Sequence, residues 1–86
     1  MGHRAKAEAN RRRHKVTFDE AVSVFYDPLS ATFPDPESSR SEERLVTIGQ
    51  SSRRRLLVVV HTEQSETIRI ISARLANAHE RKRHET

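Results

Sequence analysis

The chain has 86 residues, a formal net charge of +4, 34% hydrophobic and 33% charged residues, and no cysteine. One domain over residues 1–86 is therefore expected, without disulfides or thiolate chemistry. No apolar run approaches the ~20 residues of a membrane span, and no apolar stretch follows the N-terminal charges as in a secretory signal, so a soluble intracellular protein is predicted.

The N-terminal third is predicted to form two helices. The first covers His3 to Lys15, a segment without glycine, proline or β-branched residues. The second should begin at Phe18 and run for about ten residues, because Thr17 and Glu20 have the spacing of a capping box. Apolar side chains then recur on one helical face, namely Phe18, Ala21, Val22 and Phe25.

Extended segments and a last helix are predicted next. "LSATFPD" is a short strand, and the polar loop "PDPESSRSEE" separates it from three apolar runs, "RLVTIGQ", "RLLVVVHTE" and "TIRIISAR". Runs joined by short polar loops are typical of an antiparallel meander, and "LLVVV", apolar on both faces, should be its central strand. In "ANAHERKRHE", Asn77 and Glu80 repeat the capping spacing and predict a helix.

This order of elements predicts a small α+β domain, with an antiparallel sheet packed against the two N-terminal helices and with a C-terminal helix. The register of the last hairpin depends on its loop. A loop at residues 63–66 places Thr62 opposite Thr67. The pairs that follow from it are Arg55 with Arg74, Leu57 with Ser72, Val59 with Ile70 and His61 with Ile68.

Alternation along these strands separates the polar side chains between the two faces of the sheet. Arg44, His61 and Arg74 are expected on one face, with Glu63 beyond them. Arg69 is expected on the opposite face, among apolar side chains. The first face therefore combines groups that transfer protons with groups that bind anions.

Cleavage of RNA by its own 2′-hydroxyl needs a base, an acid and cations that stabilise the phosphorane. Arginine matches phosphate oxygens, and histidine transfers protons near neutral pH. The candidate catalytic set is His61, Glu63, Arg74 and Arg81, with Arg44 nearby and Arg81 joining if the last helix folds over the sheet end. Whether His61 or Glu63 is the general base stays open.

The charges are unevenly distributed, with +5 over residues 1–15, −4 over residues 16–66 and +3 over residues 67–86. If the two ends meet, they form one cationic surface that suits nucleic acid or an acidic protein. The candidate RNA-contacting cations are Arg44, Arg53, Arg55, Arg69 and Lys82. A solvated charged surface is an equally simple interpretation.

Several features favour a structural interpretation. Glu80 is most simply a capping residue. His79 and His84 are five positions apart and have no third ligand, so neither a metal nor another cofactor is expected. The sequence has no glycine-rich phosphate loop and no serine nucleophile elbow.

Four stretches, in fixed order, resemble the BrnT family of toxins from type II toxin–antitoxin pairs. They are "AKAEANRRRHKVTFDEAVSVFYDP", "EERLVTIG", "LLVVVHTE" and "RIISARLANAHERKR", and they span nearly the whole chain. The resemblance implies a RelE-like fold and a bacterial cytoplasmic endoribonuclease that inhibits translation. It also implies a BrnA-like antitoxin that neutralises the toxin and binds operator DNA.

Individual positions carry this resemblance. The matching residues are His14, Phe18, Arg44, Ile48, Gly49, Ser72, Arg74, Glu80 and Arg81. Among these, Arg74 and Arg81 are the residues that we expect to stabilise phosphate.

Other positions depart from the family pattern. Family members usually begin with a short strand, roughly "FEWD", where this chain has "MGHRAK". Lys15 stands where glycine is expected, and Gln64 and Leu75 stand where basic residues are common. His84 stands where an aromatic residue often closes the last helix.

Three hypotheses follow. The first is a metal-independent endoribonuclease toxin, held in a hetero-oligomer by a BrnA-like antitoxin, with operator DNA contacted only through that antitoxin and no membrane contact. The second is a catalytically weak or inactive toxin-like module that serves as antitoxin partner and co-repressor. The third is a stand-alone basic protein whose affinity for nucleic acid falls steeply with salt.

Overall fold

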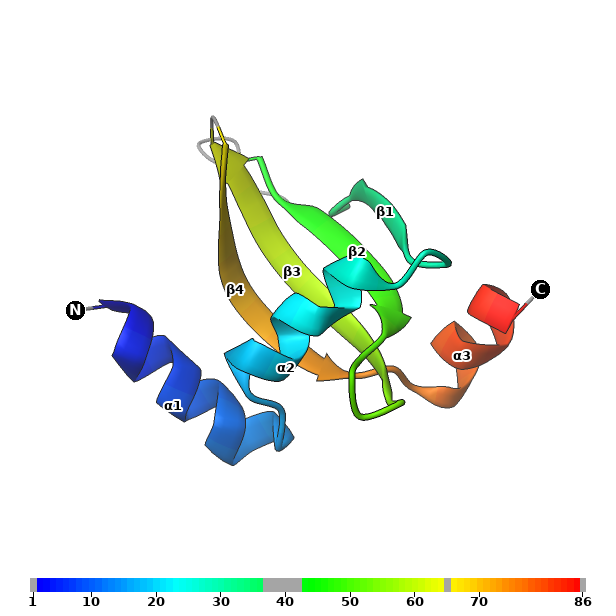
Figure 1. Ribbon diagram of the computed structural model, residues 1–86, viewed down its shortest axis with the longest axis horizontal. Coiled ribbons are helices and arrows are strands. Elements are labelled where there is room, and N and C mark those ends of the chain that lie inside the picture. Colours follow the sequence, from blue (N-terminus) through cyan, green and yellow to red (C-terminus); the bar gives the residue numbers. More distant parts are fainter. Residues whose placement is uncertain (1, 37–42, 65, 86) are drawn as a thin grey trace.

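The computed structural model describes residues 2–36, 43–64 and 66–85, with side chains from residue 7 onward except at position 64. The elements in chain order are α1 (Gly2–His14), α2 (Phe18–Ser23), the 3-10 turn η1 (Val24–Tyr26), β1 (Ala31–Pro34), β2 (Leu45–Gln50), β3 (Leu56–Gln64), β4 (Thr67–Leu75) and α3 (Ala78–Glu85). The predicted order and the small α+β fold are confirmed (Figure 1). The predicted polar loop lies largely outside the described residues.

The four strands pair antiparallel in the order β1-β2-β3-β4, so the apolar β3 is an interior strand as predicted. Helix α2 lies across one face of this sheet, and α1 lies beside its β4 edge (Figure 1). The core between the sheet and the segment from Val16 to Val24 consists of wholly buried side chains: Val16, Ala21, Val24, Leu57, Val59 and Ala73. Burial of this apolar surface stabilises the contact between the helices and the sheet.

Helix α1 has few apolar side chains, and the buried Asn10 anchors it to β4. The Asn10 side-chain nitrogen donates to the carbonyls of Val16 and Ala73 at 2.9 and 2.8 Å, and its oxygen accepts from the Ala73 N–H at 3.0 Å. The amide of Asn10 therefore satisfies backbone groups at the β4 edge. A polar contact thus supplies tertiary support that the thin apolar face of α1 lacks.

The junction between α1 and α2 depends on two backbone features. The Lys15 N–H donates to the Arg11 carbonyl at 2.9 Å, and Lys15 has a left-handed φ of 60°. Glycine adopts this conformation at least cost, which accounts for glycine being expected there. The Thr17 hydroxyl then accepts from the Glu20 N–H at 3.0 Å, which confirms the predicted N-cap of α2.

The predicted register of the last hairpin is wrong. Gln64 pairs with Thr67, so the loop is shorter than residues 63–66. None of the four predicted pairs forms, and the observed pairs include His61 with Ile70, Val60 with Ser72, Val59 with Ala73, Val58 with Arg74 and Leu57 with Leu75. The register shifts between Val60 and His61, which leaves Ile71 as an extra residue on β4.

This bulge reverses the predicted grouping of polar side chains. One extra residue exchanges the faces of the strand beyond it, so Arg74 lies on the face opposite His61. Arg69 pairs with Thr62. It therefore lies on the other face of the sheet from His61, as predicted, but on the same face as Arg74. Leu45, rather than Arg44, is the β2 partner of His61.

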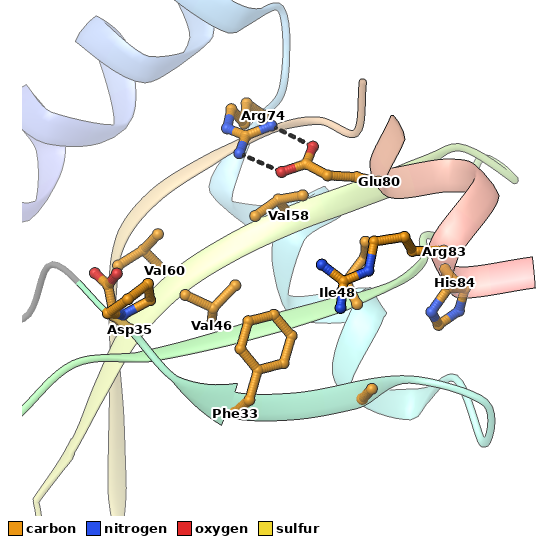
Figure 2. Close-up of a pocket in the computed structure, with 12 residues that line it drawn as sticks. Phe33, Asp35, Val46, Ile48, Val58, Val60, Arg74, Glu80, Arg83 and His84 are labelled. Atoms are coloured by element: carbon orange, nitrogen blue, oxygen red, sulfur yellow. Dashed lines mark hydrogen bonds and ion pairs between the residues drawn. The ribbon is translucent and has the colours of Figure 1, made fainter. Parts of the chain in front are cut away.

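The second face of the sheet, called the open face below, is the one that α1 and α2 do not cover. Its apolar centre consists of Val46, Ile48 and Val58, with Leu56, Val60 and Ala76 packed against them. In Figure 2, α3 stands beside this face, while α1 and α2 lie behind the sheet. The C-terminal helix therefore borders the face that the first two helices leave accessible.

Candidate functional site

The open face carries a groove of about 510 Å³, called the open-face groove below. Its floor is formed by Val46, Ile48, Val58 and Val60. The wall from β1 and the segment after it contains Ala31, Phe33, Asp35 and Pro36. The wall from the end of β4 and from α3 contains Arg74, Glu80, Arg83 and His84. An apolar floor thus meets ionisable side chains in both walls, with Asp35 in one and the other four in the second (Figure 2).

Arg74 and Glu80 form a two-pronged ion pair at the rim of this groove. Arg74 Nη1 and Nη2 donate to Glu80 Oε1 and Oε2, each at 2.8 Å (Figure 2). The hydrogen bonds from Arg74 hold the pKa of Glu80 below its ordinary value, so both groups are charged at neutral pH. Their side chains are 41% and 27% exposed, which leaves the pair accessible from solvent.

The same carboxylate also begins α3. Glu80 Oε1 accepts from the Asn77 N–H at 2.9 Å, and the Glu80 N–H donates to Asn77 Oδ1 at 2.8 Å. The predicted capping box is therefore confirmed. Since Glu80 binds Arg74 as well, the cap of α3 is tied directly to the end of β4.

His84 lies one helical turn beyond Glu80, and Glu80, Arg83 and His84 have the spacing of one helix side. His84 lines the groove and also a neighbouring hollow that contains Asp27 and Arg81. Backbone N–H groups of Gln50 and Leu29 lower the pKa of Asp27, and the charge of His84 lowers it further. His84 is therefore a partly buried imidazole between an ionised carboxylate and the groove.

His61 lies on the other face of the sheet and is wholly buried. Its Nε2 shares a hydrogen bond of 2.7 Å with the Thr47 hydroxyl, and its ring meets Phe25 edge-on at 4.9 Å between centroids. Burial lowers the pKa of His61, and the charge of Glu63, 3.8 Å from Nδ1, opposes this shift only in part. His61 is thus a neutral residue of the core, closed to solvent.

Arg55 belongs to a structural ion pair. Its Nε donates to Glu20 Oε2 at 2.9 Å, and its Nη2 bonds to Glu20 Oε1 and to the Lys15 carbonyl. The Ser51 hydroxyl donates to the same carboxylate at 2.6 Å. The bond from Arg55 is the main cause of the lowered pKa of Glu20. The Glu20 side chain therefore binds the β2–β3 turn, in addition to the helix cap that its N–H makes.

The other predicted cations are distributed around the molecule. Arg53, Arg69, Arg81 and Lys82 are exposed, whereas Arg44 is half-buried. Arg81 lines the hollow that shares His84 with the open-face groove. The structure therefore ties Arg74 to α3 through Glu80, and it places Arg74 on the face of the sheet opposite His61.

Sequence reasoning missed the groove residues Phe33, Asp35, Arg83 and His84 as a set. A signal was present for three of the groove side chains, because Glu80, Arg83 and His84 follow the i, i+3, i+4 pattern of one helix side. Phe33 gave no such signal, since its place depends on how the edge strand β1 pairs. Pairing of Phe33 with Val46 brings it to the open face.

No cluster of three or more His, Asp or Glu side chains among the described residues is placed to hold a metal ion. No helix in the described part of the chain has the length and apolar character needed to cross a membrane.

One family model matches residues 3–80 and is described as the ribonuclease toxin BrnT of type II toxin–antitoxin systems. No curated protein matches the chain. Because the family match covers most of the chain, the protein belongs to the BrnT family of ribonuclease toxins.

Proposed function

We propose that this BrnT-family chain is an endoribonuclease toxin that binds and cleaves RNA in the open-face groove and thereby inhibits translation in the cytoplasm. A BrnA-like antitoxin neutralises it within a hetero-oligomer and carries the contact with operator DNA. The observation that supports this placement is the gathering of Arg74, Arg83 and His84 along one accessible groove. Burial of His61 argues against a reaction on the other face.

The chemistry follows from the groups beside the groove. The 2′-hydroxyl attacks the neighbouring phosphorus and the bond to the 5′-oxygen breaks. His84 takes the proton of the 2′-hydroxyl and then gives a proton to the leaving 5′-oxygen. Arg74, Arg81 and Arg83 stabilise the negative charge that develops on the phosphorane. Asp27 lies in the hollow that His84 shares with the groove. The proposed reaction uses these side chains and no metal ion.

The test is incubation of the purified protein with single-stranded RNA in EDTA. The variant His84→Ala should slow cleavage by about 10²- to 10⁴-fold, the usual contribution of a general acid or base. Arg74→Ala and Arg81→Ala should slow it as well, because each removes a cation from the site. Circular dichroism of each variant checks that α3 and the sheet remain folded.

The chain offers a matched control for the histidine. His79 is exposed on the same helix and lies outside the open-face groove, so His79→Ala should cleave RNA at the wild-type rate. Equal cleavage by wild type and all three site variants contradicts the assignment of the groove. Absence of any RNA cleavage, together with normal growth after induction, contradicts the ribonuclease proposal itself.

A second candidate function is a toxin-like module that binds the antitoxin and co-represses without cleaving RNA. Two observations favour it: Glu80 occupies both amino groups of Arg74, and Leu75, where the family often has a basic residue, exposes 46% of its surface. This candidate predicts a tight antitoxin complex without toxicity. Induction of the chain with and without its neighbouring gene separates the two candidates.

A further inference from the structure

The aromatic side chain of Phe33 is exposed within the open-face groove. It stands on β1, whose four residues are all exposed, and 45% of the Phe33 surface is accessible. In Figure 2 the ring rises from β1 into the groove, over the apolar floor. An aromatic ring in this position presents a flat apolar surface to whatever enters the groove.

Phe33 is not needed to complete the apolar cluster of the open face. That cluster is made by β2 and β3 side chains with Ala76, and Phe33 is not part of it. Exposure of a large apolar ring is unfavourable in water, and Phe33 keeps 45% of its surface accessible. The position of Phe33 is therefore better explained by binding than by packing.

The chemical character of the groove changes along its length. Phe33 and the valine floor form its middle, whereas Arg83 and His84 project from α3 at one end (Figure 2). The volume of about 510 Å³ falls within the range of ~300–1,000 Å³ that small-molecule sites occupy. A flat apolar surface beside cations matches a nucleotide, which has a flat base and an anionic phosphate.

We propose that Phe33 is the stacking platform for one unpaired base of the RNA substrate, with the adjoining phosphate held by Arg83 and His84. The proposal rests on the proposed ribonuclease function and adds a substrate class, single-stranded RNA. Bases inside a duplex have both faces covered by their neighbours, so they offer no face to Phe33. The chain has more basic than acidic residues, which favours an anionic ligand such as RNA over a neutral or cationic one.

The experiment measures binding separately from cleavage. Hexanucleotides of A, C, G or U with 2′-O-methyl groups lack the attacking hydroxyl, and fluorescence anisotropy reports their affinity. Phe33→Leu keeps an apolar side chain but removes the aromatic face, and it should weaken binding about 5- to 150-fold, the range for loss of one stacked base. Phe33→Trp should retain binding. The wild type should bind a 2′-O-methyl duplex no more tightly than Phe33→Leu binds the single strand.

Tyr26 provides the matched control. It is an aromatic residue with 83% of its surface exposed, and it does not line the open-face groove. Tyr26→Leu should bind the hexanucleotides with wild-type affinity. A general loss of surface aromatic character would instead affect both leucine variants equally.

The outcomes separate this proposal from the function on which it rests. If the wild type cleaves RNA and Phe33→Leu binds and cleaves equally well, the stacking platform is refuted while the ribonuclease stands. The same holds if duplex and single strand bind alike, or if Phe33→Leu weakens only the complex with the antitoxin, which assigns the groove to a protein ligand. If no RNA is bound or cleaved by the wild type, both proposals fail.

Discussion

Replacement of Arg55 by alanine should strongly destabilise the fold. Arg55 is the main partner of the Glu20 carboxylate, whose side chain is only 4% exposed. In Arg55→Ala this carboxylate keeps the hydroxyl of Ser51 but loses its counter-charge and two hydrogen bonds. Removing one partner of a buried ion pair costs about 3–5 kcal/mol, because the remaining charge is left uncompensated.

The expected loss lies near the lower end of that range, about 3 kcal/mol, because the Arg55 side chain is 26% exposed. Water entering the space of the arginine would solvate part of the carboxylate. Domains have about 0.05–0.15 kcal/mol of stability per residue, which is roughly 4–13 kcal/mol for 86 residues. The substitution should therefore remove a large share of the free energy of unfolding.

Urea unfolding followed by circular dichroism at pH 7 measures this loss. Arg53→Ala is the control, because Arg53 is exposed in the same turn and should change stability by less than about 0.5 kcal/mol. If Arg55→Ala lost less than about 1 kcal/mol in free energy of unfolding, the reasoning would be refuted. A loss that small is typical of a surface ion pair.

The pH dependence gives an independent check. The folded-state pKa of Glu20 lies below its ordinary value of 4.5, so the ion pair contributes its full stability above pH 4.5. That contribution is lost as the pH falls through the lowered pKa. The difference in the free energy of unfolding between wild type and Arg55→Ala should therefore be largest near neutral pH and should narrow in acid, as Glu20 becomes protonated.

Three further substitutions test other parts of the fold. Lys15→Gly should raise the free energy of unfolding by about 1 kcal/mol in urea, because Lys15 has a φ of 60°; an equal gain from Lys15→Ala would point to charge instead of backbone conformation. Gly49→Ala should lower it by about 1–3 kcal/mol in the same assay, since the new Cβ would lie 2.7 Å from Ser30 Cβ and 2.9 Å from Val24 Cγ1; an unchanged midpoint would contradict this close contact. The pKa of buried His61 lies below 6.5, so stability should fall as the pH drops below 6.5, and His61→Gln should flatten that dependence; an unchanged slope would show that other groups cause it.

The secondary structure could be predicted because its signals are local. The threonine at position 17 and the asparagine at position 77 cap their helices as their spacing indicated. The run "LLVVV" became the interior strand β3, since a neighbouring strand on each side buries more of its apolar side chains than an edge position would. The family resemblance also followed from the sequence, and the match over residues 3–80 agrees with it.

The composition of the site was decided by the tertiary structure. The short loop and the extra residue at Ile71 set the register of β4, and neither follows from the hydrophobic pattern, which fits more than one pairing. Because successive strand residues point to opposite faces, one extra residue sends Arg74 to the open face while His61 stays in the core. The ion pair of Arg74 with Glu80 then links β4 to α3, which carries His84 beside the same groove as Phe33.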